Sequence, residues 1–121
     1  MTRVLLVEDQ PAVRFTLERA LRLNGYDVTA VDSIGDMQNR PVFDQIDILL
    51  SDVLLPGPMD GFALAKRARA LWPRLPIVLI SGLALANPPA DMLSDPLVRL
   101  LGKPFTIAAL MRAFSELLHS N

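Results

Sequence analysis

The sequence predicts an α/β fold in which a doubly wound, five-stranded parallel sheet is covered by helices on both faces. Three observations support this prediction. Five short runs are apolar almost throughout, which is typical of strands that are buried on both faces. Segments with apolar residues at helical spacing alternate with these runs, as expected for a parallel sheet with crossover helices. The chain has 121 residues, which fits one domain spanning residues 1–121.

Two strands and one helix are predicted at the start of the chain. The run "RVLLVE" indicates a first strand at Arg3–Glu8. An apolar helical face follows and carries Val13, Leu17, Ala20 and Leu21. This helix is expected to end at Asn24 and Gly25, because these residue types commonly follow the last helical turn. The run "YDVTAV", residues 26–31, indicates the second strand.

The middle of the chain continues the alternation less regularly. Residues 33–45 form at best a weak, short helix, because Pro41 interrupts the segment. The run "IDILLS", residues 46–51, indicates the third strand. After the turn "PGPMDG", a helix that stops before Pro73 is marked by Leu64, Ala65, Ala68 and Leu71. The run "PIVLIS", residues 76–81, indicates the fourth strand.

The segment before the fifth strand departs from this pattern. Residues 83–96 include Pro88, Pro89 and Pro96, so the fourth helix is expected to be short or distorted. The run "VRLLG", residues 98–102, indicates the fifth strand. The last helix has the clearest apolar face, which is formed by Ile107, Leu110, Met111, Phe114, Leu117 and Leu118.

Composition argues against several classes of protein. The chain has 12 Lys and Arg against 13 Asp and Glu, so no net field attracts nucleic acid or an anionic membrane. Cysteine is absent, which excludes disulfides and thiolate zinc sites. The apolar run at the N-terminus is short and is broken by Glu8 and Asp9, which does not fit a signal peptide. No apolar run approaches the roughly 18 residues of a membrane span. We therefore expect a cytoplasmic protein with no direct nucleic-acid or membrane partner.

Five polar groups come at or just after the carboxyl ends of predicted strands, and they are Glu8, Asp9, Asp52, Ser81 and Lys103. In open parallel sheets, ligands bind outside these strand ends, where the strand order reverses. In the flavodoxin-like order 2-1-3-4-5 the reversal lies between the first and third strands, which would bring the three acids together. Asp52 ends an apolar run, where an unpaired carboxylate is costly or takes up a proton. This acid therefore needs a cation, a metal or a chemical role.

The same five groups suit the transfer of a phosphoryl group to a carboxylate. Three carboxylates repel one another unless a cation holds them, and all-oxygen ligation suits Mg²⁺ or Mn²⁺ better than zinc. Lys103 could pair with one acid or with a phosphoryl group, and Ser81 could donate a hydrogen bond to a phosphoryl oxygen. Asp52 would then be the nucleophile, because carboxylates do attack phosphorus.

Each polar group also has a purely structural interpretation. An aspartate at a strand end is often a turn or cap residue, and Asp9 could cap the first helix. Ser81 could serve turn chemistry before the glycine that follows it. Asp60 is predicted to cap a helix, and His119 is predicted to be a solvated residue near the end of the last helix.

The runs "LLVEDQ", "SDVLLPGPMDG", "LISG" and "GKPF" resemble, in order and spacing, the motifs of the receiver domains of two-component response regulators. The resemblance spans essentially the whole chain. It implies a phosphorylation-dependent signalling switch of a His-Asp phosphorelay. Such a switch takes a phosphoryl group from a histidine kinase or a histidine phosphotransfer protein and signals by protein-protein contact to an output partner that the sequence does not identify. It is not an enzyme in the usual sense, although it catalyses its own aspartyl phosphorylation and dephosphorylation.

The resemblance implies a magnesium site at the acidic residues. Asp9 would bind Mg²⁺ directly, with Mn²⁺ as a possible substitute, and Glu8 would act on the metal mainly through water. Asp52 and the backbone carbonyl of Leu54 would be further ligands.

The resemblance also implies how the phosphoryl group is held. Asp52 would be the phosphoacceptor, and Lys103 would contact the phosphoryl group. Ser81 would be the switch hydroxyl that swings toward it. Pro104 would hold the peptide after the lysine in the cis form, which proline allows at modest cost.

Two positions depart from the commonest receiver pattern. The loop "LPGPMDG" after Asp52 has one more residue, as in receivers attached to, or working beside, hybrid histidine kinases. Leu100 stands where the family usually carries a Tyr or Phe whose ring turns inward on phosphorylation. The output face formed by the fourth helix, fifth strand and last helix is therefore expected to be remodelled.

Three other functions remain open at this point. A Mg²⁺-dependent phosphatase resembling haloacid dehalogenases would place a second acid two residues after its nucleophile, where this chain has Leu54. A flavodoxin-type binding module would need a Ser/Thr/Gly-rich phosphate loop where "EDQPAV" stands. A degenerate receiver would signal without phosphorylation, against which the complete set of five polar groups counts. The sequence does not distinguish a stand-alone receiver from one excised from a larger protein.

Overall fold

Strands and helices alternate along the chain in the computed structural model, which describes residues 1–32, 46–55, 60–82 and 88–119. The strands are β1 (Arg3–Val7), β2 (Asp27–Val31), β3 (Ile48–Asp52), β4 (Ile77–Gly82) and β5 (Val98–Lys103). The helices of these residues are α1 (Pro11–Leu23), α3 (Gly61–Leu71), α4 (Ala90–Ser94) and α5 (Ile107–Leu118). The weak helix predicted within residues 33–45 lies outside the described residues.

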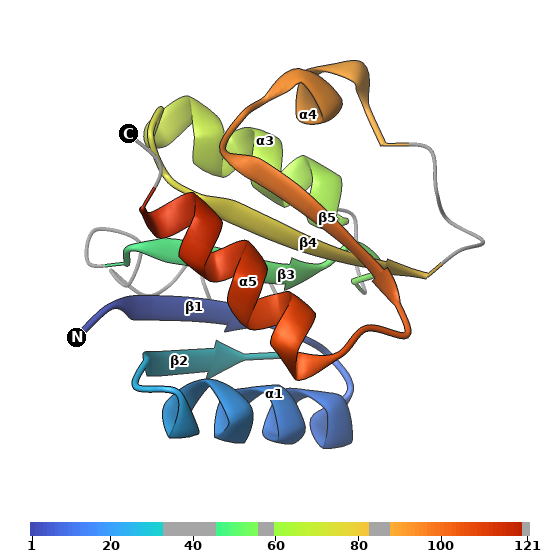
Figure 1. Cartoon of the computed structure of the whole chain (residues 1–121). Helices are drawn as coiled ribbons and strands as arrows, with labels where there is room; N and C mark the ends of the chain where they lie inside the picture. The colour runs from blue at the N-terminus through green and yellow to red at the C-terminus, as the bar shows by residue number, and fades with distance from the viewer. Residues whose placement is uncertain (33–45, 56–59, 83–87, 120–121) are drawn as a thin grey trace.

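The strands form one parallel sheet in the order β2-β1-β3-β4-β5 (Figure 1). This order confirms the prediction of a doubly wound sheet. Because β1 pairs with both β2 and β3, the strand order reverses between β1 and β3. All five strands point the same way, so their carboxyl ends meet at one edge. The crevice expected at a reversal therefore lies between the ends of β1 and β3.

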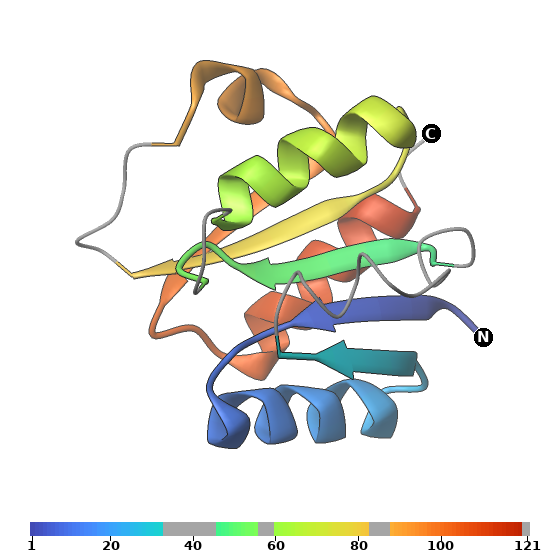
Figure 2. The ribbon, with the colours of Figure 1, turned by 180° about the vertical axis from the view of Figure 1, so that it is seen from behind.

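Helices cover both faces of the sheet, as the alternation of the sequence predicts. In Figure 1, α5 lies in front of the sheet and α1 runs below β2, and Figure 2 shows α3 in front when the molecule is seen from behind. Successive residues of β1 enter different cores because a strand alternates its side chains. Val4 and Leu6 pack in the cluster that contains the buried residues of α1 and α5. Leu5 and Val7 pack in the cluster that contains those of α3.

The first turns of α1 and α3 show which of the two aspartates Asp9 and Asp60 caps a helix. The N-cap of α1 is Gln10, whose side chain makes no cap hydrogen bond, so the suggestion that Asp9 caps this helix is wrong. Pro11 begins the helix with its fixed φ angle. Asp60, in contrast, is the N-cap of α3, and its Oδ1 accepts from the Ala63 N–H at 2.8 Å, as predicted.

The fourth helix is short, as its prolines predict, because α4 has only five residues. Pro89 is its N-cap and lacks the N–H that an earlier turn would need. Met92 is the residue that α4 buries in the core. The loop after α4 is tied to α3 by an ion pair in which Arg69 Nε lies 2.7 Å from Asp95 Oδ2. One buried side chain and one ion pair thus hold this short helix near α3.

Candidate functional site

The structure brings all five sequence-predicted groups to the carboxyl edge of the sheet. The parallel register sets Val7 beside Ser51, Asp52 beside Ile80, Ser81 beside Gly102, and Gly82 beside Lys103. The groups at this edge are Glu8 and Asp9 after β1, Asp52 at the end of β3, Ser81 in β4, and Lys103 at the end of β5. The edge therefore holds three acids, one hydroxyl and one cation.

Asp52 is buried and is held from two sides. Its Oδ2 forms an ion pair of 2.7 Å with Lys103 Nζ, and its Oδ1 accepts from the Leu54 N–H at 2.9 Å. The Asp52 side chain is 6% exposed, against 37% for Lys103. Burial lowers the pKa of Lys103, but its hydrogen bond to Asp52 and the nearby carboxylates raise it above the ordinary value. Lys103 is therefore a permanent cation that faces the nucleophile candidate.

Glu8 is fully buried beside Asp52, so ionising its carboxyl group costs free energy. Its Oε1 accepts from the Gln10 N–H at 3.1 Å, while its Oε2 is buried without a hydrogen-bond partner among the described residues. Burial, with a further contribution from Asp52, raises the pKa of Glu8 from 4.5 to about 7. The hydrogen bond from Gln10 and the charge of Lys103 oppose this rise without cancelling it. A cation at Oε2 would relieve the cost of ionising this carboxyl group.

The remaining predicted groups lie at the rim. Asp9 is exposed, and its charge contributes to the raised pKa of Lys103. Ser81 is half-buried, and its Oγ donates to the carbonyl oxygen of Gly82 at 3.0 Å. Leu54 is 63% exposed. Among the described residues, Asp9 and Leu54 thus give this rim a solvent-exposed surface.

The geometry of this edge agrees with the comparisons with known proteins. The family model of the response regulator receiver domain matches residues 4–115. The chain belongs to this family. CpdR of Brucella abortus, a response regulator receiver protein, is 36% identical over 120 residues, which cover 98% of each chain. A crystal structure of a response regulator receiver protein from Sinorhizobium medicae has 32% sequence identity and a TM-score of 0.81, covering 98% of this chain and 95% of that one.

Relatives of the receiver differ in length. The sensor kinase CckA of Brucella abortus is 34% identical over 119 residues, and the match covers 95% of this chain but 12% of CckA. The match to FleR of Pseudomonas aeruginosa, a response regulator protein, covers 23% of that protein. This chain therefore spans nearly all of CpdR but only a small part of CckA and FleR. Membership of the family favours a receiver over the phosphatase and the flavodoxin-type module.

The donor chemistry of the receiver's acidic edge fits a hard divalent cation. Glu8 and Asp52 offer carboxylate oxygens from buried positions, and Glu8 Oε2 has no partner among the described residues. Within those residues, however, no three acidic or histidine side chains are already arranged around one metal position. The predicted pocket of three carboxylates is therefore not preformed. This arrangement suits Mg²⁺, which commonly uses one or two carboxylates and keeps several waters.

Three residues support the edge without having been singled out from the sequence as site residues. Arg14 Nη1 donates to the carbonyl oxygen of Glu8 at 2.9 Å, which fixes the turn that carries this acid. Ser51 is fully buried, and its Oγ donates to the carbonyl oxygen of Asp52 at 2.9 Å. Gly61 packs against the same peptide. The glycine after Asp60 is visible in the turn motif, whereas no sequence signal marks Arg14 or Ser51.

The cis peptide bond predicted before Pro104 is confirmed. The departure at Leu100 is also visible, because this side chain lies in β5 and is 37% exposed. Together with Phe62, Ser81 and Pro88, it lines a largely apolar pocket of about 150 Å³ beside the acidic edge. The place next to Ser81 is therefore lined by an aliphatic side chain in β5 instead of an aromatic one.

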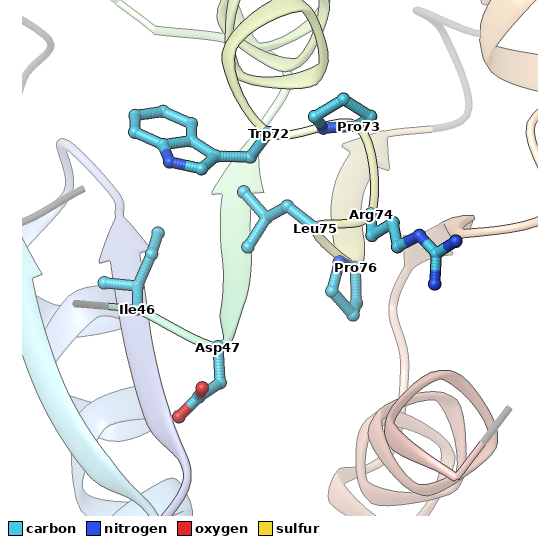
Figure 3. A pocket seen from close by; sticks show the side chains of 7 residues that line it. All are labelled: Ile46, Asp47, Trp72, Pro73, Arg74, Leu75 and Pro76. Atoms are coloured by element: carbon cyan, nitrogen blue, oxygen red, sulfur yellow. The ribbon is translucent and has the colours of Figure 1, made fainter. Parts of the chain in front are cut away.

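A larger pocket lies away from this chemistry. It has a volume of about 460 Å³ and is lined by Ile46, Asp47, Trp72, Pro73, Arg74, Leu75 and Pro76 (Figure 3). Asp47 and Pro76 directly precede β3 and β4, so this pocket is at the amino edge of the sheet, opposite Asp52. The Asp47 carboxylate accepts from the Arg3 N–H at 2.8 Å. The larger of these two pockets is therefore not the one beside the acidic edge.

Proposed function

We propose that this receiver is a phosphorylation-dependent switch in which Asp52 accepts a phosphoryl group from a phosphohistidine. The observation that carries the proposal is the 2.7 Å ion pair between Lys103 Nζ and the buried Asp52, beside a Glu8 oxygen that has no hydrogen-bond partner among the described residues. An aspartate carboxylate can act as a nucleophile toward phosphorus, and the Lys103 ammonium group holds one Asp52 oxygen at this edge of the sheet. The same lysine is placed to neutralise charge that arrives with a phosphoryl group.

The transfer makes one bond and breaks another. A carboxylate oxygen of Asp52 forms the new bond to phosphorus while the P–N bond of the donor breaks, and the electron pair of that bond returns to the imidazole nitrogen. Lys103 then contacts a phosphoryl oxygen in place of Asp52 Oδ2. Ser81 turns from the carbonyl oxygen of Gly82 and donates to another phosphoryl oxygen. The carbonyl oxygen of Gly82 then loses its donor, which couples the chemistry to the end of β4.

A divalent cation completes the proposed site. Glu8, Asp9, Asp52 and the backbone carbonyl of Leu54 would hold Mg²⁺, or Mn²⁺ in its place, and the cation would neutralise charge on the phosphoryl oxygens. The buried Glu8 Oε2, for which the described part of the chain provides no hydrogen-bond partner, supports this assignment. Hydrolysis of the aspartyl phosphate by the receiver itself would reset the switch.

The partners follow from the family. The sensor kinases CckA, RcsC and EvgS have segments similar to this chain, which supports a histidine kinase or a histidine phosphotransfer protein as the donor. Output would be by protein-protein contact, because the near-neutral charge gives this segment no electrostatic affinity for nucleic acid. In the described part of the chain, no helix has both the length and the apolar character to span a membrane. A cytoplasmic location without membrane contact is part of the proposal.

Intact-mass spectrometry after incubation with acetyl phosphate and Mg²⁺ tests the proposal. We expect one added phosphoryl group in the parent and in Asp91→Asn, a control that alters an exposed aspartate of α4. We expect none in Asp52→Asn, because the amide lacks the nucleophilic oxygen. Equal addition to the parent and to Asp52→Asn would place the acceptor elsewhere. No addition to the parent, with Mg²⁺ binding shown by titration, would favour a receiver that signals without phosphorylation.

A further inference from the structure

Gly61 is the first residue of α3, and it lies against the backbone that follows the proposed nucleophile. Its N–H donates to the carbonyl oxygen of Val53 at 2.8 Å, and the residue is buried. A Cβ atom at this position would overlap the carbonyl oxygen of Asp52 and lie 2.6 Å from Cα of Val53. Because carbon atoms normally approach no closer than about 3.5 Å, any side chain at residue 61 would require the backbone to move by about 1 Å.

Both sides of this contact are anchored in the core. On the strand side, the Val53 N–H donates to the carbonyl oxygen of Ile80 at 2.8 Å, which extends the pairing of β3 with β4. On the helix side, α3 buries Leu64 and Ala65 almost completely. A side chain at residue 61 would therefore displace the Asp52–Val53 backbone, where the chain leaves β3, because the core holds both the strand and the helix in place.

The Asp52–Val53 backbone determines where the Asp52 carboxylate stands. Its two oxygens are held at 2.7 Å from Lys103 Nζ and at 2.9 Å from the Leu54 nitrogen, and a shift of the Asp52 peptide would alter both contacts. We propose that Gly61 is a positioning residue for phosphoryl transfer, because only the absence of a side chain lets α3 begin against the Asp52–Val53 backbone. The inference rests on the proposed role of Asp52 as phosphoacceptor.

Other glycines at the same edge provide a matched control. Among the described residues, a Cβ atom at Gly82 or Gly102 would meet nothing within 4 Å, although Gly82 ends β4 and Gly102 is the penultimate residue of β5. The requirement for glycine is therefore a property of the contact at Gly61 and not of the edge as a whole. Gly102→Ala adds the same methyl group in β5 without a steric conflict among the described residues.

The experiment compares Gly61→Ala, Gly102→Ala and Leu117→Ala below their unfolding temperatures. Leu117→Ala opens a cavity in the core under α5 and so controls for loss of stability alone. The first readout is the rate of phosphorylation by acetyl phosphate with Mg²⁺. The second is the amide signal of Leu54 in a ¹⁵N-labelled, unphosphorylated sample, which reports the hydrogen bond to Asp52 and does not depend on phosphorylation.

We expect Gly61→Ala to be phosphorylated about 10- to 100-fold more slowly, since a misplacement of about 1 Å at a reacting group has an effect of this order. Its Leu54 amide signal should shift, while the two controls keep the parent rate and the parent signal. A parent-like rate with an unshifted signal would overturn the inference, as would an equal loss of rate in Leu117→Ala. Failure of Gly61→Ala to fold would also overturn it, because the contact would then serve the fold as a whole.

The outcome is distinguishable from failure of the proposed function. If the parent itself takes up no phosphoryl group on Asp52, the proposed function fails, and the Leu54 amide alone then decides whether Gly61 places this carboxylate. A shifted signal in Gly61→Ala would retain the placement, and an unshifted signal would refute it.

Discussion

Replacing Glu8 with glutamine tests the cost of the most deeply buried acid of the receiver. Glu8 is fully buried, and its Oε2 has no hydrogen-bond partner among the described residues. Burial is the largest cause of its raised pKa, and Asp52 adds to it. Glutamine has nearly the same shape and carries no charge. Glu8→Gln should therefore remove the cost of ionisation while it leaves the packing in place.

The sign and size of the effect follow from the two pKa values. The pKa of Glu8 is about 7 in the folded chain against an ordinary value of 4.5. Between these values the unfolded chain has lost the proton that the folded chain keeps, so the contribution of Glu8 to stability falls as the pH rises through this window. At about 1.4 kcal/mol per pKa unit, the full cost above pH 7 is about 3 kcal/mol.

Urea unfolding at pH 4 and pH 8 in EDTA measures this cost. The free energy of unfolding of Glu8→Gln minus that of the parent should be about 3 kcal/mol larger at pH 8 than at pH 4, which means that the variant gains stability relative to the parent. Glu116→Gln, which alters an exposed acid on α5, should follow the parent at both pH values. Addition of Mg²⁺ at pH 8 should stabilise the parent more than Glu8→Gln. An identical pH dependence of the parent and Glu8→Gln would refute the argument from burial.

Two further predictions concern the rim of the site and the short helix α4. Leu54→Asn should shorten the lifetime of phosphorylated Asp52 several-fold, because the exposed leucine offers no polar group to orient an attacking water. Timed intact-mass measurements check this, and equal lifetimes would contradict it. Asp95→Ala should destabilise the fold by about 2 kcal/mol, because Arg69 loses the partner of a mostly buried ion pair. Urea unfolding measures the loss, which should exceed that of the exposed control Asp91→Ala.

The sequence was informative where one physical effect dominated. All five residues of β3 are buried, and a continuous apolar run is the pattern that such a strand requires. Prolines shortened α4 because each one removes a backbone donor. Polar residues that end parallel strands meet at one edge, so the sequence predicted that Lys103 could pair with one of the acids, and the structure shows that this acid is Asp52.

Other features depend on geometry that residue patterns do not encode. The hydrogen bond from Arg14 to the Glu8 carbonyl oxygen is made across a turn, and its residue types are common on any helix. The sequence predicted three clustered acids, but Asp9 is exposed to solvent. Its position depends on the path of the chain after β1, which the residue pattern does not encode. The close approach of Gly61 to Asp52 appears only when the helix and strand are placed together.

The ion pair between Asp52 and Lys103 also bears on how the chain becomes competent. These residues are 51 positions apart, and β4 lies between their strands, so the pair forms only after β3, β4 and β5 have all joined the sheet. Contacts between distant parts of a chain form late, because the entropy of closing the intervening loop must first be overcome. A nascent chain that lacks β5 would hold the acid without its cation. Only chains in which the whole sheet has been synthesised and folded would therefore react with a phosphodonor. Partly folded chains would not be phosphorylated and would not signal.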